Sequence, residues 1–183
     1  HPRLLTIKTG RDQTEVVEAM TAGRLPELEA LDLSGYVFKK DSPSCGIERV
    51  RLYNRHGMPS RQGIGLFARA FMERFPLIPV AEEGRLCDPL LRENFIERVF
   101  CYRRWRGLLQ NGVTTHDLVR FHTIHKYLLL SHSPQQYRLL GRLVAEGRRS
   151  RPKDLAFHYG ELFMKALAVT ATVRKHVNVL HHL

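Results

Sequence analysis

Residues 35–53, GYVFKKDSPSCGIERVRLY, carry the pattern that decides the fold of the first half of the chain. GYVFKK (35–40) is an apolar, β-rich run that ends in polar residues, and ERVRLY (48–53) alternates as a half-exposed strand does. Between them lies Cys45, in a predicted turn. Pro43 restricts Ser42 to extended geometry, and Gly46 permits a sharp bend directly after the cysteine. The stretch therefore predicts a strand, a cysteine-bearing loop and a second strand.

Strand and helix patterns alternate on both sides of this stretch. We expect further strands at 4–8 and 77–80, and helices at 12–31 (with a break near Gly23) and 63–75. Such alternation is typical of an α/β layer with parallel strands. Residues 1–86 are therefore predicted to form a partial, Rossmann-like α/β domain.

The pattern changes to helices alone in residues 87–183. Asp88 is a good N-cap and Pro89 suits a first helical turn, which predicts a helix to about residue 109. The other expected helices span 115–131, 134–146, and 152 to the end with a bend near 170–172. This half is predicted to be an all-α domain.

Charge is unevenly distributed along the chain. The net charge is +11, with 13 basic and 11 acidic residues (+2) in 1–86 and 16 basic and 7 acidic residues (+9) in 87–183. The positive charge of the second half favours a polyanionic partner, and a nucleic acid is favoured over a membrane. The alternative is a basic surface without a partner, which would give the same net charge. Three widely spaced cysteines argue against a disulfide framework and favour a reducing, cytoplasmic setting.

Cys45 follows a strand, where open α/β sheets bind their ligands. The neighbouring lysines favour a thiolate, which serves equally as a nucleophile or a metal ligand. A small buried cysteine in a turn is the alternative interpretation.

Several stretches resemble known families. The segments 35–53, GMPSRQGIGLFARAF and FPLIPVAEEGRLCDP are similar to the C-terminal part of the thiouracil desulfidase (TudS) family. The segments RENFIERVFCYRRW, LVRFHTIHKYLLLSHSPQQYRLLGRLV and KHVNVLHHL resemble the YbgA-type helical domain. The combination resembles bacterial desulfidases that convert 4-thiouridine in tRNA to uridine.

The resemblance implies a [4Fe–4S] cluster held by three cysteines, with one iron open to the substrate's sulfur. Cys45 takes the position of one metal ligand, and Ser42 that of a catalytic residue beside the cluster. The family's other two ligands belong to N-terminal motifs that do not occur here, so we expect them upstream of residue 1 and expect this chain to be a fragment, truncated also at its C-terminus. Alternatively, the chain is a relative without a cluster.

Cys87 and Cys101 are poor substitutes for those two ligands. They are fourteen residues apart, about 20 Å along a helix, which is too far for one cluster. We interpret both as small apolar residues.

Arginines of the helical half are the candidate RNA contacts, since arginine pairs with phosphate in a forked geometry. One set flanks Trp105, which either stacks on a base or belongs to the core. Lys126 lies beside a histidine pair, His122 and His125, that we read as a packing seam or a phosphate contact rather than a metal site. The complete set of RNA-binding candidates is Arg103, Arg104, Arg106, Lys126, Arg138, Arg142, Arg148 and Arg149.

Three functions fit these observations. The leading one is an iron–sulfur desulfidase acting on thiolated uridine in tRNA, in which the helical half binds the RNA and this fragment alone is inactive. The rivals are a nucleic-acid-binding module without catalysis, and a stress or repair accessory protein that binds other proteins.

Overall fold

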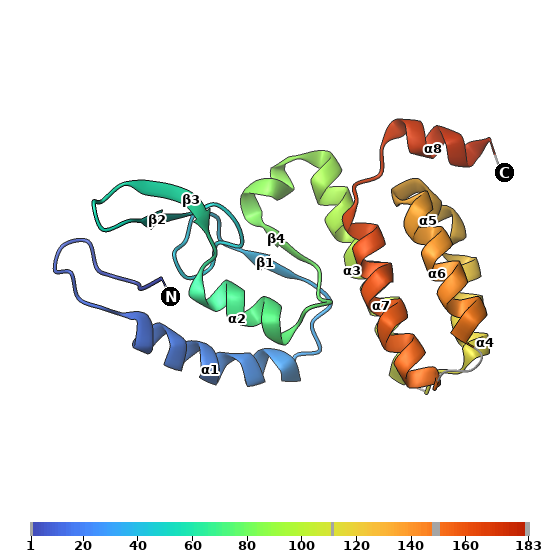
Figure 1. Ribbon diagram of the computed structural model, residues 1–183, viewed down its shortest axis with the longest axis horizontal. Helices are drawn as coiled ribbons and strands as arrows, with labels where there is room; N and C mark the ends of the chain where they lie inside the picture. The colour runs from blue at the N-terminus through green and yellow to red at the C-terminus, as the bar shows by residue number, and fades with distance from the viewer. Residues whose placement is uncertain (1, 111, 148–150, 182–183) are drawn as a thin grey trace. The chain divides into compact units, whose positions relative to one another are not determined.

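The computed structural model describes residues 2–110, 112–147 and 151–181. The chain separates into two compact units, His1–Asp88 and Pro89–Leu183. Figure 1 shows that the first unit mixes helices with short strands, whereas the second consists of helices. This order, α/β followed by all-α, confirms the predicted fold class.

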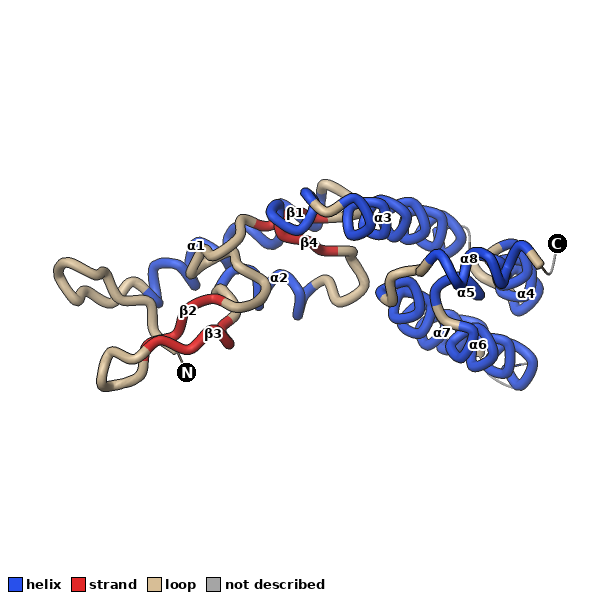
Figure 2. Tube along the Cα trace, turned by 90° about the horizontal axis from the view of Figure 1, so that it is seen from above, coloured by secondary structure: helices blue, strands red, loops and turns tan. Residues whose placement is uncertain are grey.

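The first unit contains one parallel and one antiparallel strand pair. Its elements in chain order are α1 (Thr14–Ala30), β1 (Tyr36–Phe38), β2 (Val50–Tyr53), β3 (Pro59–Gly63), α2 (Leu66–Arg74), β4 (Val80–Glu82) and the 3₁₀ helix η1 (Glu83–Cys87). Strands β1 and β4 pair in parallel, with Tyr36 opposite Val80 and Phe38 opposite Glu82. Strands β2 and β3 form an antiparallel hairpin, seen in red in Figure 2.

Aromatic rings join β1 to α2. Phe38 and Phe71 are fully buried, and their rings meet edge to face with centroids 5.4 Å apart. Tyr36 packs 4.5 Å from Phe71 on the same side of the strand pair. Such ring pairs add to the apolar area that each residue buries. Helix α2 packs in turn against α1, so α2 fixes the position of β1 and of the loop that follows it.

Three sequence predictions for this unit were wrong in detail. Residues 4–8 form no strand, because Ile7 is fully exposed and the Gly10 amide donates to the Thr6 carbonyl within a turn; Leu5 makes an isolated bridge to Asp12. Helix α1 is continuous through Gly23. Strand β4 starts where the predicted strand at 77–80 ends, since residues 76–78 form a turn and a bend.

The second unit is a packed set of helices. These are α3 (Pro89–Gln110), α4 (Thr115–Ile124), α5 (Lys126–His132), α6 (Pro134–Glu146), α7 (Pro152–Ala168) and α8 (Val173–Leu180). Helix α7 packs against α3, α5 and α6, and Figure 2 shows α6 and α7 running side by side. The region predicted as one helix at 115–131 is two helices, separated at His125.

Trp105 is the centre of this core. It is 1% exposed, and its ring contacts Phe121 edge to face at 5.4 Å and Tyr159 at 5.5 Å. Gly160 lies directly against the indole, because a Cβ there would come within 2.7 Å of Nε1. Trp105 therefore belongs to the core, and the alternative in which it stacks on a base does not hold.

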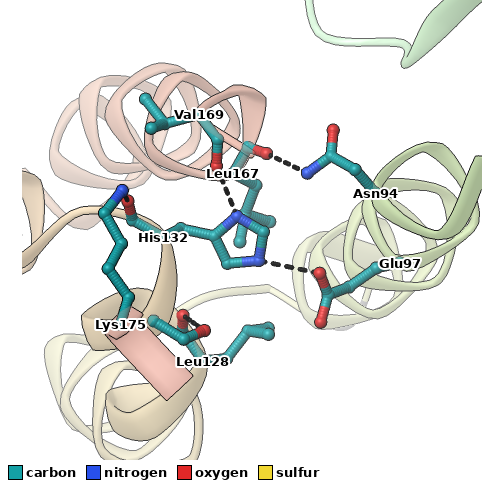
Figure 3. A network of polar contacts seen from close by, with 8 residues as sticks. Asn94, Glu97, Leu128, His132, Leu167, Val169 and Lys175 are labelled. Carbon is teal, nitrogen blue, oxygen red and sulfur yellow. Dashed lines mark hydrogen bonds and ion pairs between the residues drawn. The ribbon is translucent and has the colours of Figure 1, made fainter. Parts of the chain in front are cut away.

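A buried polar network ties four helices of this unit together (Figure 3). The His132 ring, 1% exposed, donates from Nδ1 to the Val169 carbonyl at 2.6 Å, and its Nε2 lies 2.7 Å from a carboxylate oxygen of Glu97. Lys175 donates to the His132 carbonyl at 2.5 Å, and Asn94 donates to the Leu167 carbonyl at 3.0 Å. The network joins α3 and α5 to the end of α7, to Val169 after it, and to α8.

Across residues 2–110, 112–147 and 151–181, no helix has both the length and the apolarity that crossing a membrane requires.

Candidate functional site

The Cys45 loop, residues 39–49, connects β1 to β2 at one edge of the parallel pair. The register of β1 and β4 brings Phe38 and Glu82 opposite each other, so both strands end at this edge. Ligands of open α/β sheets bind beyond the carboxyl ends of the strands. Cys45 is half-buried there, at the position that the sequence predicts.

Ser42 shapes the turn that carries the cysteine. Its hydroxyl oxygen accepts from the Cys45 amide at 3.2 Å, and its carbonyl accepts from the Gly46 amide at 2.8 Å. The Ser42 and Ser44 hydroxyl oxygens are 3.1 Å apart, and the Ser44 hydroxyl lies 3.4 Å from the Cys45 sulfur. Two hydroxyls and one thiol thus form a continuous polar chain.

Glycines allow the loop to press against α2. A Cβ on Gly65, the N-cap of α2, would overlap the Ser44 carbonyl and lie 2.7 Å from the Cys45 nitrogen. The Gly65 amide donates to the Gly46 carbonyl at 2.8 Å, and the Ala68 amide donates to the Ser44 carbonyl at 3.1 Å. The start of α2 therefore supports the turn by direct backbone contact.

Two glutamates at the end of β4 bind the same loop. Glu82, 3% exposed, accepts from the Ile47 amide at 2.9 Å and from the Glu48 amide at 3.5 Å. Glu83 accepts from the Lys40 amide at 2.6 Å. Neither glutamate was predicted to belong to the site. The available signal was a pair of adjacent acidic residues close behind the predicted strand at 77–80.

Backbone strain brackets the loop. Asp41 and Arg49 adopt left-handed conformations, with φ of 54° and 58°. Non-glycine residues rarely adopt this region, and they persist there only where surrounding contacts impose it. The contacts at the two ends of the loop supply that constraint.

Tyr36 reports the electrostatic environment beside the thiol. Burial raises the pKa of its phenol, and the proximity of the Cys45 thiolate raises it further, partly opposed by Arg24. Its ring is held by Phe38 and Phe71. Tyr36 therefore places a neutral phenol, held in one position by aromatic packing, near Cys45.

The described residues supply one thiolate, rather than a full set, for a metal cluster. Cys87 is exposed, and Cys101 is buried in α3, where burial raises the pKa of its thiol to about 11. In the part of the chain that the structure describes, no three His, Cys, Asp or Glu side chains gather where they could hold a metal ion. Among the described residues, Cys45 alone would therefore be available to hold a [4Fe–4S] cluster, and the other ligands would have to come from elsewhere.

The basic candidates on α3 are near the Trp105 core. Arg103 and Arg104 are exposed, whereas Arg106 is half-buried and its guanidinium lies 5.9 Å from the centre of the Tyr102 ring. The exposed side chains of Arg103 and Arg104 can reach a phosphate group. Arg106 also packs on the Tyr102 ring of its own helix.

A second basic group lies on α6. Arg138 and Arg142 are exposed and line a depression of about 540 Å³ together with Gly141 and Ala145. Gly141 lets α6 approach α4 closely, because a Cβ there would lie 3.3 Å from Nε2 of His122. Two arginines one helical turn apart can contact neighbouring phosphates.

The remaining basic candidates are not part of the group on α6. Lys126 is exposed on α5, with its amine 5.2 Å from the centre of the Tyr127 ring. Arg148 and Arg149 lie outside the described residues.

The histidine pair is part of the helical packing. His122 stacks on Tyr137 at 4.8 Å and bonds the Tyr159 hydroxyl at 3.2 Å, and His125 bonds the Phe121 carbonyl at 2.8 Å. Burial lowers the pKa of both imidazoles. The pair thus forms the packing seam that was one of the two interpretations of the sequence.

Comparisons with known proteins find similarity to two separate parts of the chain. Residues 1–83 match the family described as 2-thiouracil desulfurase, and residues 126–183 match the family described as "Protein of unknown function (DUF1722)". The "Uncharacterized protein YbgA" of Escherichia coli strain K12 is 31% identical over 86 residues, which cover 46% of this chain and 51% of that protein. The match thus spans about half the length of this relative. No solved structure matches the chain.

Proposed function

We propose that this chain, which joins a TudS-like segment to a YbgA-like segment, is part of a desulfidase that removes sulfur from a thiolated uracil ring. The preferred substrate is 4-thiouridine within tRNA. Water supplies the oxygen that replaces the sulfur, which gives uridine and releases hydrogen sulfide. The observation that carries this proposal is the Ser42–Gly46 turn at the carboxyl edge of β1 and β4, inside the segment that matches 2-thiouracil desulfurase.

Cys45 is proposed as one ligand of a [4Fe–4S] cluster whose other ligands lie outside this sequence. Thiolates suit iron–sulfur clusters, and the half-buried thiol is held on a rigid turn. When bound, the cluster supplies a Lewis-acidic iron for the departing sulfur. Free cysteine thiols stay reduced in the cytosol, and we propose the cytoplasm as the location of this protein.

Ser42 is proposed as a catalytic residue. Its oxygen accepts from the Cys45 amide, which leaves the hydroxyl hydrogen free to turn toward Ser44 or toward a substrate atom. A hydroxyl in this position can hydrogen-bond the base or relay a proton.

The helical unit is proposed to bind the RNA. Residues 87–183 carry a net charge of +9, and the exposed arginines on α3 and α6 offer phosphate contacts. A free thiouracil base would need no such surface, so the charge favours a polynucleotide substrate. The proposed contacts are Arg103, Arg104, Arg106, Lys126, Arg138, Arg142, Arg148 and Arg149.

Anaerobic purification of the intact natural protein tests the catalytic proposal. We expect a brown protein that releases sulfide from 4-thiouridine in tRNA, and we expect Cys45→Ser to lose both colour and activity. Cys87→Ser is the matched control and should retain both. A colourless protein that binds tRNA normally would reject the desulfidase and favour the nucleic-acid-binding module, which is consistent with the incomplete ligand set among the described residues.

The salt dependence of tRNA binding tests the RNA surface. Each lost phosphate contact reduces the slope of log K against log salt by about 0.9 for a duplex. The double variant Arg138→Gln, Arg142→Gln should therefore flatten the slope by about 2. The control is the double variant Arg24→Gln, Arg74→Gln, which removes the same charge from exposed ion pairs of the first unit. Equal slopes for the two double variants would reject the α6 surface.

A further inference from the structure

We propose that residues 82–85, Glu-Glu-Gly-Arg, form a clamp that positions the Cys45 loop, with Glu82 as its main positioning residue. The inference rests on the proposed function only in taking Cys45 as part of the site. The clamp contacts the loop where it leaves β1 and again where it approaches β2, and the thiol lies between these two attachments.

Glu82 holds the outgoing end of the loop. Glu82 is 3% exposed, and its carboxylate accepts the Ile47 and Glu48 amides through the same oxygen, Oε1. A buried carboxylate is costly unless hydrogen bonds compensate it, and bonds from amides to a charged acceptor are among the stronger ones. Glu82 and the loop amides therefore stabilise each other, and losing the carboxylate leaves two backbone donors without their acceptor.

The next three residues hold the remaining contacts. Glu83 accepts the Lys40 amide at 2.6 Å, and Arg85 pairs with the carboxylate of Glu48. Gly84 gives the Lys40 side chain room, because a Cβ there would lie 3.0 Å from its Cδ. Four consecutive residues thus contact both ends of one loop.

The clamp complements the support from α2. The amides of Gly65 and Ala68 hold the Gly46 and Ser44 carbonyls, which lie on either side of Cys45. Helix α2 therefore supports the middle of the loop, whereas the clamp fixes its ends. With both supports present, the thiol and the Ser42 hydroxyl keep one relative geometry without any regular secondary structure between them.

Amide exchange and thiol reactivity in the full chain test the clamp. In a Cys87→Ser background, Cys45 is the reactive thiol, since Cys101 is buried with a raised pKa. We compare Glu82→Ala with Glu82→Gln, which keeps an acceptor oxygen, and with Glu73→Ala, which removes an exposed carboxylate from α2. Hydrogen exchange is followed at Ile47 and iodoacetamide labelling at the cysteine.

Glu82→Ala should accelerate Ile47 exchange and Cys45 labelling by at least about tenfold, the factor that one bond to a charged acceptor contributes. The Phe75 amide of the first unit, bonded to Phe71, should exchange as before. Glu82→Gln should restore most of the protection, and Glu73→Ala should change nothing. Unchanged exchange in Glu82→Ala, or equal loosening in the Ala and Gln variants, would overturn the clamp. Neither readout needs substrate or turnover, so failure here is distinct from failure of the proposed function.

Discussion

Replacing Gly65 by alanine should displace the Cys45 loop. The added Cβ would lie 2.7 Å from the Cys45 nitrogen and closer still to the carbonyl of Ser44. Ordinary contact at a Cβ begins near 3.4 Å, so the Ser44–Cys45 peptide must move by about 1 Å. Gly65 has φ −63° and ψ 148°, which alanine adopts freely. The perturbation is therefore purely steric, and it acts on the backbone that carries the thiol.

The size of the effect follows from this displacement. Overpacking a tight contact costs about 1–3 kcal/mol of folding free energy. A misplacement of about 1 Å in a reacting group lowers turnover by about 100-fold. We therefore expect a chain that still folds, with faster alkylation of the cysteine because the displaced turn no longer packs under α2. For the desulfidase proposed above, we expect turnover of thiolated uridine to fall by up to about 100-fold.

The assay needs a matched glycine. Gly23 lies inside α1 with no atom within 4 Å of its added Cβ, so Gly23→Ala should stabilise the first unit by about 1 kcal/mol and leave Cys45 labelling unchanged. Stability is measured as the hydrogen exchange of α2 peptides in increasing urea, and labelling by mass spectrometry in the Cys87→Ser background. If Gly65→Ala matches the wild type in exchange, labelling and turnover, the described contact between α2 and the loop is incorrect.

The second unit yields three further predictions, each measured by urea unfolding with Trp105, the single tryptophan, as fluorescent reporter. Gly160→Ala should lower the free energy of unfolding by about 1–3 kcal/mol, because the added Cβ would collide with the buried indole. The control is Gly107→Ala, whose Cβ would meet no atom within 4 Å and which should raise that free energy by up to about 1 kcal/mol. Equal effects of the two variants would contradict this packing. His132→Ala should cost about 2–4 kcal/mol, since it leaves the buried network incomplete, and a loss under 1 kcal/mol would argue against that network. Burial lowers the pKa of His125, so the unfolded state binds more protons below about pH 6.5, and stability should fall between about pH 7 and pH 5. His125→Leu should reduce that slope; an unaltered slope would count against burial as its cause.

Local signals in the sequence predicted the helices that have strong caps. Helix α6 begins and ends at the predicted residues, because Ser133 caps the helix by accepting the Gln136 amide and Pro134 occupies its first turn. The strand at 35–40 was also found, since its apolar run is bounded by polar residues on the loop side. Both elements are determined mainly by their own residues.

Other boundaries depend on competing bonds that periodicity does not reveal. The apolar pattern runs through His125, yet its imidazole takes the Phe121 carbonyl at 2.8 Å and its backbone leaves helical geometry at φ −92° and ψ 9°. Strand β3, Pro59–Gly63, has a polar sequence and exists because it pairs with β2. Pairing partners and side-chain bonds of this kind are set by the tertiary fold.

The candidate site likewise combines local contacts, which the sequence predicts, with long-range contacts, which it does not. The proximity of Ser42 to Cys45 follows from a turn of four residues, and the sequence contains that turn. The clamp contacts residues 40, 47 and 48 from at least 34 positions away, through the parallel pairing of β1 with β4. Parallel pairing has no short-range signature, so these contacts could not be inferred from local patterns.

The parallel pairing also sets an order of events during translation. Cys45 leaves the ribosome about 40 residues before Arg85, and at typical rates of 5–20 residues per second this interval is about 2–8 s. For that time the nascent thiol has neither β4 nor the glutamates that later fix its surroundings. During that interval the thiol is exposed to oxidants and metal ions without the contacts that half-bury it in the folded chain.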